Sequence, residues 1–237
     1  MSELLAEALG IHFEDPTLLQ LALTHRSYIY ETPGEGQFSN ERLEFLGDSI
    51  LAFVSTDYLY RAYPDLTEGE LTDVRAVLVK TETLANFARD IALGNFLLMG
   101  KGEQNSGGGK RVLASAFEAL LGAIYLDQGI AAVQQFLLHR MEPIAQTIVK
   151  KRLFKDDKSL FQELAQAHEG ITPWYRLASQ EGPSHNREFT VEVLLGEEVA
   201  GKGHGRNKQT AEQEAAHAAL KSRGWIRMIP DLNGWIE

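Results

Sequence analysis

Residues 40–51 read NERLEFLGDSIL, and their spacing predicts an amphipathic helix. At about 100° per residue, Glu41, Glu44 and Asp48 fall within one arc of roughly 60°. The opposite side collects the apolar side chains Leu43, Leu46, Ile50, Phe53 and Val54. Carboxylates on one side of a helix usually face solvent, which is one interpretation of this pattern. The other is a bound divalent cation, because three like charges at this spacing destabilise a helix unless something neutralises them.

Residues 112–126, VLASAFEALLGAIYL, predict a buried second helix whose only charge is Glu118. A buried carboxylate must form an ion pair, bind a metal or stay protonated. An ion pair with Arg42 or Arg75 is therefore an open alternative. Otherwise the carboxylates of both helices, without Cys or His at ligand spacing, form an oxygen set that suits Mg²⁺. Mg²⁺ with acidic ligands most often serves phosphoryl or phosphodiester chemistry.

The whole chain has 237 residues, no Cys and a net charge of −10. The absence of Cys excludes disulfide frameworks, thiolate zinc sites and iron–sulfur clusters. The acidic balance argues against a protein that grips nucleic acid over its whole surface, because phosphate binding needs Lys and Arg. The N-terminus is acidic and no apolar run approaches the ~18 residues of a membrane span, so we expect a cytoplasmic protein with no membrane partner.

Charge density rises and hydrophobic periodicity lapses over residues 149–157, which predicts a linker between two domains. Residues 1–148 read as an all-α domain, with a capping box at Thr67 that opens a helix to about residue 90 and a glycine-rich loop over residues 100–110. Residues 158–224 read as a small α+β domain of order α-β-β-β-α. Its predicted elements are a helix capped by Ser159 that ends near residue 168, strands over 173–179, 187–194 and 197–203, and a helix capped by Asn207 that ends near residue 222. The tail, residues 225–237, carries two Trp and should pack on a surface.

Residues 201–208, GKGHGRNK, put basic side chains in a glycine loop that enters a helix. Exposed amides, the positive end of the helix dipole and the Lys and Arg side chains together form a phosphate-binding site. A second exposed turn carries His185, which can reach a groove edge. The alternative for the loop is a solvated basic turn.

These motifs together resemble the bacterial ribonuclease III family. Residues 40–51 are similar to its signature, residues 112–122 to its second catalytic helix, and residues 158–224 to a double-stranded-RNA-binding domain. The resemblance implies an all-α endonuclease domain followed by that domain, a homodimer, and Mg²⁺-dependent hydrolysis of double-stranded RNA, with Mn²⁺ as a substitute. The products would carry 5′-phosphate and 3′-hydroxyl ends with short 3′ overhangs, as in the processing of rRNA and mRNA precursors.

The same resemblance assigns roles to single residues. The acidic catalytic cluster would consist of Glu41, Glu44, Asp48 and Glu118. Of these, Glu44, Asp48 and Glu118 would be the metal ligands, and Glu68 would be an accessory acid. The residues placed at the RNA are Gln162, Glu163, His185, Arg206, Asn207 and Lys208.

Two residues depart from the family pattern. Ser115 stands where an Asp is usual, three residues before the catalytic Glu, and Gln209 stands where a second Lys is common. Because three carboxylates remain and Mg²⁺ retains waters, we expect activity to survive, with Ser115 bonded to a metal-bound water. Two alternatives stay open. One is a non-catalytic double-stranded-RNA-binding protein, which only Ser115 supports, and the other is an all-α nucleotide pyrophosphohydrolase, which has no use for the second domain.

Overall fold

The computed structural model describes residues 11–32, 34, 38–105, 108–151, 153–183 and 187–225. The chain forms two compact units that divide between Phe154 and Lys155. The predicted linker at residues 149–157 overlaps both neighbouring helices, because one continues to Lys151 and the next begins at Asp157. Among the helices described, none is long and apolar enough to cross a membrane.

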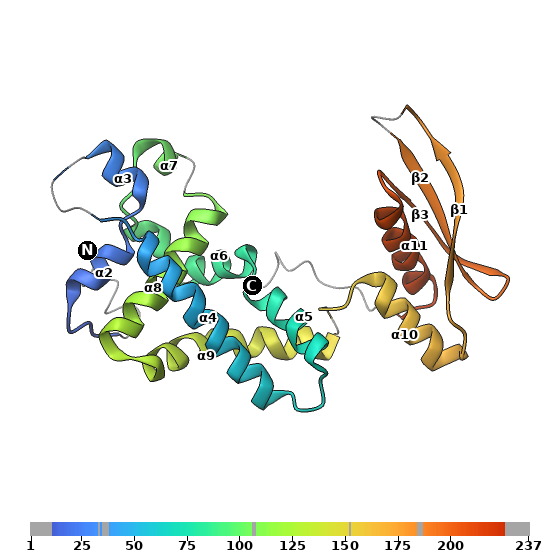
Figure 1. The fold of residues 1–237 in the computed structure, drawn as a ribbon, viewed down its shortest axis with the longest axis horizontal. Coiled ribbons are helices and arrows are strands. Elements are labelled where there is room, and N and C mark those ends of the chain that lie inside the picture. The colour runs from blue at the N-terminus through green and yellow to red at the C-terminus, as the bar shows by residue number, and fades with distance from the viewer. Residues whose placement is uncertain are drawn as a thin grey trace. The chain divides into compact units, whose positions relative to one another are not determined.

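The regular secondary structure of the first unit is helical over the described residues, apart from one isolated bridge between Thr24 and Leu98. Figure 1 shows its elements, which are α2 (Pro16–Ala22), α3 (Arg26–Glu31), α4 (Glu41–Ala62), α5 (Glu68–Leu78), α6 (Thr81–Asp90), the 3-10 helix η1 (Leu93–Phe96), α7 (Lys101–Asn105), α8 (Lys110–Gln128) and α9 (Ile130–Lys151). The predicted capping box at Thr67 is confirmed, since its side chain and that of Glu70 each bond the other's backbone amide. These caps decide where α5 begins.

Helix α8 lies at the centre of this unit and packs against α2, α4, α6 and α9. Every residue from Leu113 to Ile124 is buried except Ser115 and Glu118, which are half-buried. The centroid of the Phe117 ring of α8 lies 5.6 Å from that of Phe87 and 5.9 Å from that of Phe136. The apolar composition of α8 therefore predicts its burial correctly. The close packing around the helix restricts the side chains of Ser115 and Glu118.

The helix predicted from Thr67 to about residue 90 is two helices, which corrects the sequence prediction. The backbone turns extended at Lys80, with a ψ of 152°. The Thr83 hydroxyl donates to the Val77 carbonyl at 2.8 Å, which satisfies a carbonyl that α5 leaves open at its end. Helix periodicity continues through the break, so the apolar pattern alone does not reveal it.

Two further predictions for this unit are wrong. The sequence predicts a loop over residues 100–110, yet residues 101–105 form α7, where the Lys101 amide donates to the Glu31 carboxylate at 3.0 Å. An acidic partner on α3 thus satisfies an amide at the start of α7, which composition cannot show. Phe53, placed on the apolar side of the helix, is 58% exposed.

The second unit has the predicted order α-β-β-β-α. Its elements are α10 (Asp157–Glu169), β1 (Trp174–Glu181), β2 (Glu188–Leu195), β3 (Glu198–Gly205) and α11 (Lys208–Ser222). The strands form one antiparallel sheet in the order β1-β2-β3, and each strand begins and ends within two residues of its predicted bounds. The first helix starts before Ser159, because the Asp156 carboxylate accepts the Ser159 amide at 3.0 Å and acts as the cap.

The core of this unit lies between the sheet and the two helices, and small residues set the spacing. Gly201, Gly203 and Gly205 alternate along β3 and so face α11. A Cβ on Gly203 would lie 2.2 Å from the Ala215 amide nitrogen of α11. The glycines therefore allow the backbones of β3 and α11 to approach closely.

Trp225 shows where the first residue of the tail packs. Its ring stacks on His168 at 5.1 Å between centroids and lies 5.7 Å from the Phe161 ring of the core. The tail prediction thus holds for Trp225, and residues 226–237 lie outside the described part of the chain.

Candidate active site and nucleic-acid interface

Two glycines bring α4 and α8 into backbone contact. A Cβ on Gly47 would lie 1.8 Å from the Glu118 carbonyl oxygen, and one on Gly122 would lie 2.5 Å from the Leu43 carbonyl oxygen. No other residue type fits at this crossing without moving a helix. The crossing places Glu44 and Asp48 of α4 beside Glu118 of α8.

The pKa of Glu118 is shifted by its surroundings in the site. Burial, then the nearby charges of Asp48 and Glu44, raise the pKa of Glu118 to about 7. Within the described residues none of these three carboxylates forms an ion pair, and Arg75 instead donates to the Thr56 hydroxyl at 2.8 Å. The salt-bridge interpretation of Glu118 is therefore wrong.

Ser115 contacts a side chain of this cluster directly. Its hydroxyl donates to Glu44 Oε1 at 2.7 Å. As the side chains stand, no three acidic or imidazole groups in the described chain converge closely enough to ligate one ion. The donor chemistry nevertheless fits a hard cation, because three carboxylates without a basic partner share one negative field.

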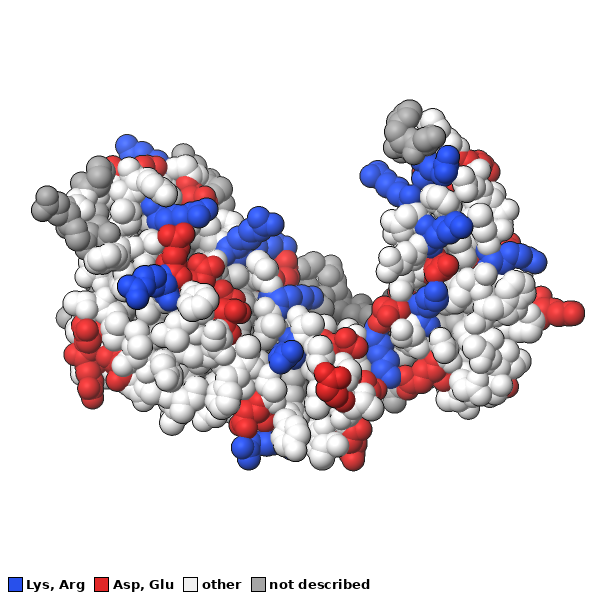
Figure 2. Space-filling view, viewed as in Figure 1, with Lys and Arg blue, Asp and Glu red and all other residues white. Residues whose placement is uncertain are grey.

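The other two predicted acids, Glu41 and Glu68, lie outside the cluster of three carboxylates. Glu41 accepts from the Ser39 hydroxyl at 2.8 Å and pairs with Arg26 at 3.5 Å. Glu68 begins α5 and accepts from the Thr72 hydroxyl at 3.4 Å. Figure 2 shows acidic side chains along the face where α4 lies, with Lys and Arg at its border. This border could neutralise phosphates on either side of the acids.

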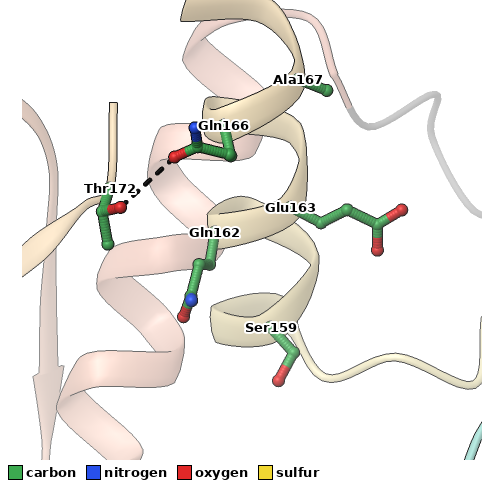
Figure 3. A pocket seen from close by; sticks show the side chains of 6 residues that line it. All are labelled: Ser159, Gln162, Glu163, Gln166, Ala167 and Thr172. Carbon is green, nitrogen blue, oxygen red and sulfur yellow. Dashed lines mark hydrogen bonds between the residues drawn. The ribbon is translucent and has the colours of Figure 1, made fainter. Parts of the chain in front are cut away.

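A hollow of about 520 Å³ runs along α10 of the second unit, and Figure 3 shows the side chains that line it. It is lined by Ser159, Gln162, Glu163, Gln166, Ala167 and Thr172. Gln162 and Gln166 point to the same side, and Gln166 accepts from the Thr172 hydroxyl at 3.3 Å, whereas Glu163 points away and pairs with Lys155. The sequence prediction missed Ser159 and Gln166, although helical spacing from Gln162 would have found both.

The basic turn lies between β3 and α11. Arg206, Lys208 and Gln209 are exposed. Asn207 caps α11, because its side-chain oxygen accepts the Thr210 amide at 2.8 Å. In Figure 2, Lys and Arg side chains gather along the edge of this unit where α11 lies. His185, also predicted at the RNA, lies outside the described residues.

Comparison with known proteins accounts for both units. A Ribonuclease-III-like family model matches residues 15–144, and a double-stranded RNA binding motif matches residues 158–223. The chain belongs to the ribonuclease III family. Among its ribonuclease III relatives, Ribonuclease 3 of Pelotomaculum thermopropionicum is 46% identical over 92% of this chain and 91% of its own length. Ribonuclease 3 of Oceanobacillus iheyensis is 47% identical over 92% of this chain and 96% of its own length.

Solved ribonuclease III structures agree for the first unit. The nuclease domain of ribonuclease III from Campylobacter jejuni is 36% identical, with a TM-score of 0.55, over 60% of this chain and 97% of that one. Family membership makes this chain a metal-dependent endoribonuclease that acts on double-stranded RNA. The pyrophosphohydrolase alternative is therefore wrong.

Proposed function

We propose that this ribonuclease III hydrolyses double-stranded RNA with Mg²⁺ held by Glu44, Asp48 and Glu118, and that Mn²⁺ can substitute. The observation that carries the proposal is Glu118, whose pKa is raised to about 7 because burial and two neighbouring carboxylates oppose its ionisation. A divalent cation bound between these carboxylates would favour the ionised form of Glu118. The oxygen-only donor set matches the preference of Mg²⁺.

Bound there, Mg²⁺ would activate a water and stabilise the leaving oxygen. The chain's own residues set the geometry. Glu44 and Asp48 lie one turn apart on α4, and Glu118 comes from α8, so the backbone contact at Gly47 determines how far apart the oxygens stand. Attack by water at phosphorus with departure of the 3′ oxygen leaves a 5′-phosphate and a 3′-hydroxyl.

The proposal includes a homodimer that cuts both strands and leaves short 3′ overhangs. Helix α4 exposes three large aromatic side chains, with Phe45 at 79%, Phe53 at 58% and Tyr60 at 73% exposure. Exposed apolar area of this kind favours a protein partner. The Campylobacter structure concerns a region involved in dimer formation of its nuclease domain, and a second copy of this chain is the matching partner. Glu41 and Glu68 would serve as accessory acids in the joint valley.

RNA would be held by the second unit. The amide side chains of Gln162 and Gln166 on α10 offer donors and acceptors to 2′-hydroxyls, and Arg206 and Lys208 offer charge to phosphates. Recognition of this kind reads the A-form shape and little sequence. Precursors of rRNA and mRNA in the cytoplasm are substrates of the expected class, and His185 would add a minor-groove contact.

Glu118→Gln tests the proposal, because it keeps the side-chain shape and removes the charge. Cleavage of a long duplex RNA in Mg²⁺ should fall by on the order of 10²-fold or more, while duplex affinity measured in chelator stays within about twofold of wild type. Glu142→Gln, an exposed change on α9, is the matched control and should cleave normally. Parallel loss of binding and cleavage in Glu118→Gln would make the residue structural, and a wild type that cuts no duplex at any Mg²⁺ or Mn²⁺ concentration would favour the non-catalytic RNA-binding protein.

A further inference from the structure

The contact between Ser115 and Glu44 joins the two helices of the catalytic cluster. Ser115 lies on α8, three residues before Glu118 and on the same face, and its hydroxyl donates to Glu44 Oε1 on α4 at 2.7 Å. Ser115 is half-buried in a segment where nearly every other residue is buried. The surrounding packing therefore restricts the hydroxyl, and at 2.7 Å its bond to the Glu44 carboxylate is a short one.

A donor at this position acts differently from a carboxylate. The crossing of α4 and α8 already places two carboxylates, Glu44 and Asp48, beside Glu118. A fourth negative group at position 115 would add to the repulsion among them when no cation is present. The Ser115 hydroxyl brings no charge and instead occupies one acceptor site of Glu44 Oε1, which leaves the rest of the carboxylate to bind an ion.

We propose that Ser115 is a positioning residue that ties the Glu44 carboxylate of α4 to the face of α8 that carries Glu118 before metal binds. This inference rests on the proposed function of the same three carboxylates. It assigns to Ser115 a direct bond to Glu44 in place of the expected bond to a metal-bound water. It has two consequences. The site is stable without metal, and it needs more Mg²⁺ for half-occupancy than a site with four carboxylates.

Three substitutions separate these consequences. Ser115→Ala removes the donor, Ser115→Thr keeps it, and Ser115→Asp replaces it with a charge. Ser55→Ala is the matched control, because Ser55 is a fully buried helical serine whose hydroxyl donates to the Leu51 carbonyl of its own helix at 2.7 Å. Each variant is measured as full-length protein by thermal unfolding in chelator, by unfolding across a Mg²⁺ titration, and by cleavage of a duplex RNA across the same titration.

Ser115→Ala should lower kcat at saturating Mg²⁺ by about 10- to 100-fold, the usual effect of losing a partner that orients a ligand. Ser115→Thr should recover at least half of wild-type kcat. Ser115→Asp should lower the Mg²⁺ midpoint of both stabilisation and cleavage and lower the unfolding temperature in chelator. Ser55→Ala should change only the unfolding temperature.

The inference is overturned if Ser115→Ala keeps wild-type kcat and midpoint, or if Ser115→Thr is as impaired as Ser115→Ala. It is also overturned if Ser115→Asp leaves the Mg²⁺ midpoint and the unfolding temperature in chelator unchanged. In each case a wild type that cleaves and is stabilised by Mg²⁺ leaves the proposed function standing. A wild type that is neither active nor stabilised by Mg²⁺ would overturn both.

Discussion

The crossing of α4 and α8 at Gly47 offers the sharpest test of how this site is built. In Gly47→Ala the new methyl would start 1.8 Å from the Glu118 carbonyl oxygen, whereas ordinary contacts begin at 3.4 Å. The helices must therefore part by about 1.6 Å, since the obstacle is backbone and cannot rotate away. That movement pulls Glu44 and Asp48 away from Glu118.

Two magnitudes follow from this displacement. Overpacking a close contact costs about 1–3 kcal/mol, and we expect the upper end here because neither backbone can yield alone. For a unit of this size, about 3 kcal/mol corresponds to a fall of roughly 6–12 °C in unfolding temperature. A misplacement on the order of 1 Å at a catalytic centre costs about 10²-fold in rate, so cleavage should fall by at least that factor.

The chain provides its own internal reference for the assay. All three Trp lie at or after residue 174, so Trp fluorescence reports the second unit and far-UV circular dichroism reports mainly the helices of the first. Gly47→Ala should lower the dichroism transition and leave the fluorescence transition in place. Gly69→Ala on α5 is the control, because no atom lies within 4 Å of the added methyl, and it should be neutral or slightly stabilising. If Gly47→Ala unfolds and cleaves as wild type does, the account of the crossing is refuted.

Three further outcomes concern the second unit. Gly203→Ala should abolish the Trp-fluorescence transition of the second unit and duplex binding, because the new methyl would start 2.2 Å from the backbone of α11. The helices of the nuclease unit should persist, and retained duplex binding would contradict this expectation. Lys208→Ala should weaken binding equally for unrelated duplexes and reduce the slope of log affinity against log salt by about 0.9; a sequence-selective loss would remove the phosphate assignment. Burial alone would raise the pKa of the Asp156 carboxyl, but hydrogen bonds from Gln213 and Ser159 hold it below its usual value. Ionised Asp156 therefore stabilises the fold above an unfolded pKa of about 3.9, and this contribution is lost as pH falls through the lower folded value. Asp156→Asn should flatten the fall in the fluorescence melting temperature below about pH 4, and an unchanged profile would contradict that role.

Helix periodicity is sufficient to predict which carboxylates share a side of α4 and that α8 is buried around Glu118. It does not predict the rotamer of Glu44 or the distance between two helices, so the bond from Ser115 to Glu44 becomes visible only in three dimensions. Strand alternation and turn residues likewise predict the second unit to within two residues at each strand end. The start of α7 was missed because it depends on Glu31, which lies 70 residues away in sequence. The break at Lys80 was missed for another reason, since it depends on a side-chain bond from Thr83 to the Val77 carbonyl that an apolar pattern does not record.

Gly47 and Gly203 solve the same problem in the two units, and this links the packing to the function. Each removes a side chain where a functional element must touch another backbone, α8 in the first unit and α11 in the second. The contact at Gly47 sets how far Glu118 stands from the carboxylates of α4, and the contact at Gly203 sets how closely α11, which begins at Lys208, lies on the sheet. A chain with every charged residue of both sites but a larger side chain at either glycine should therefore keep its net charge and lose the corresponding activity.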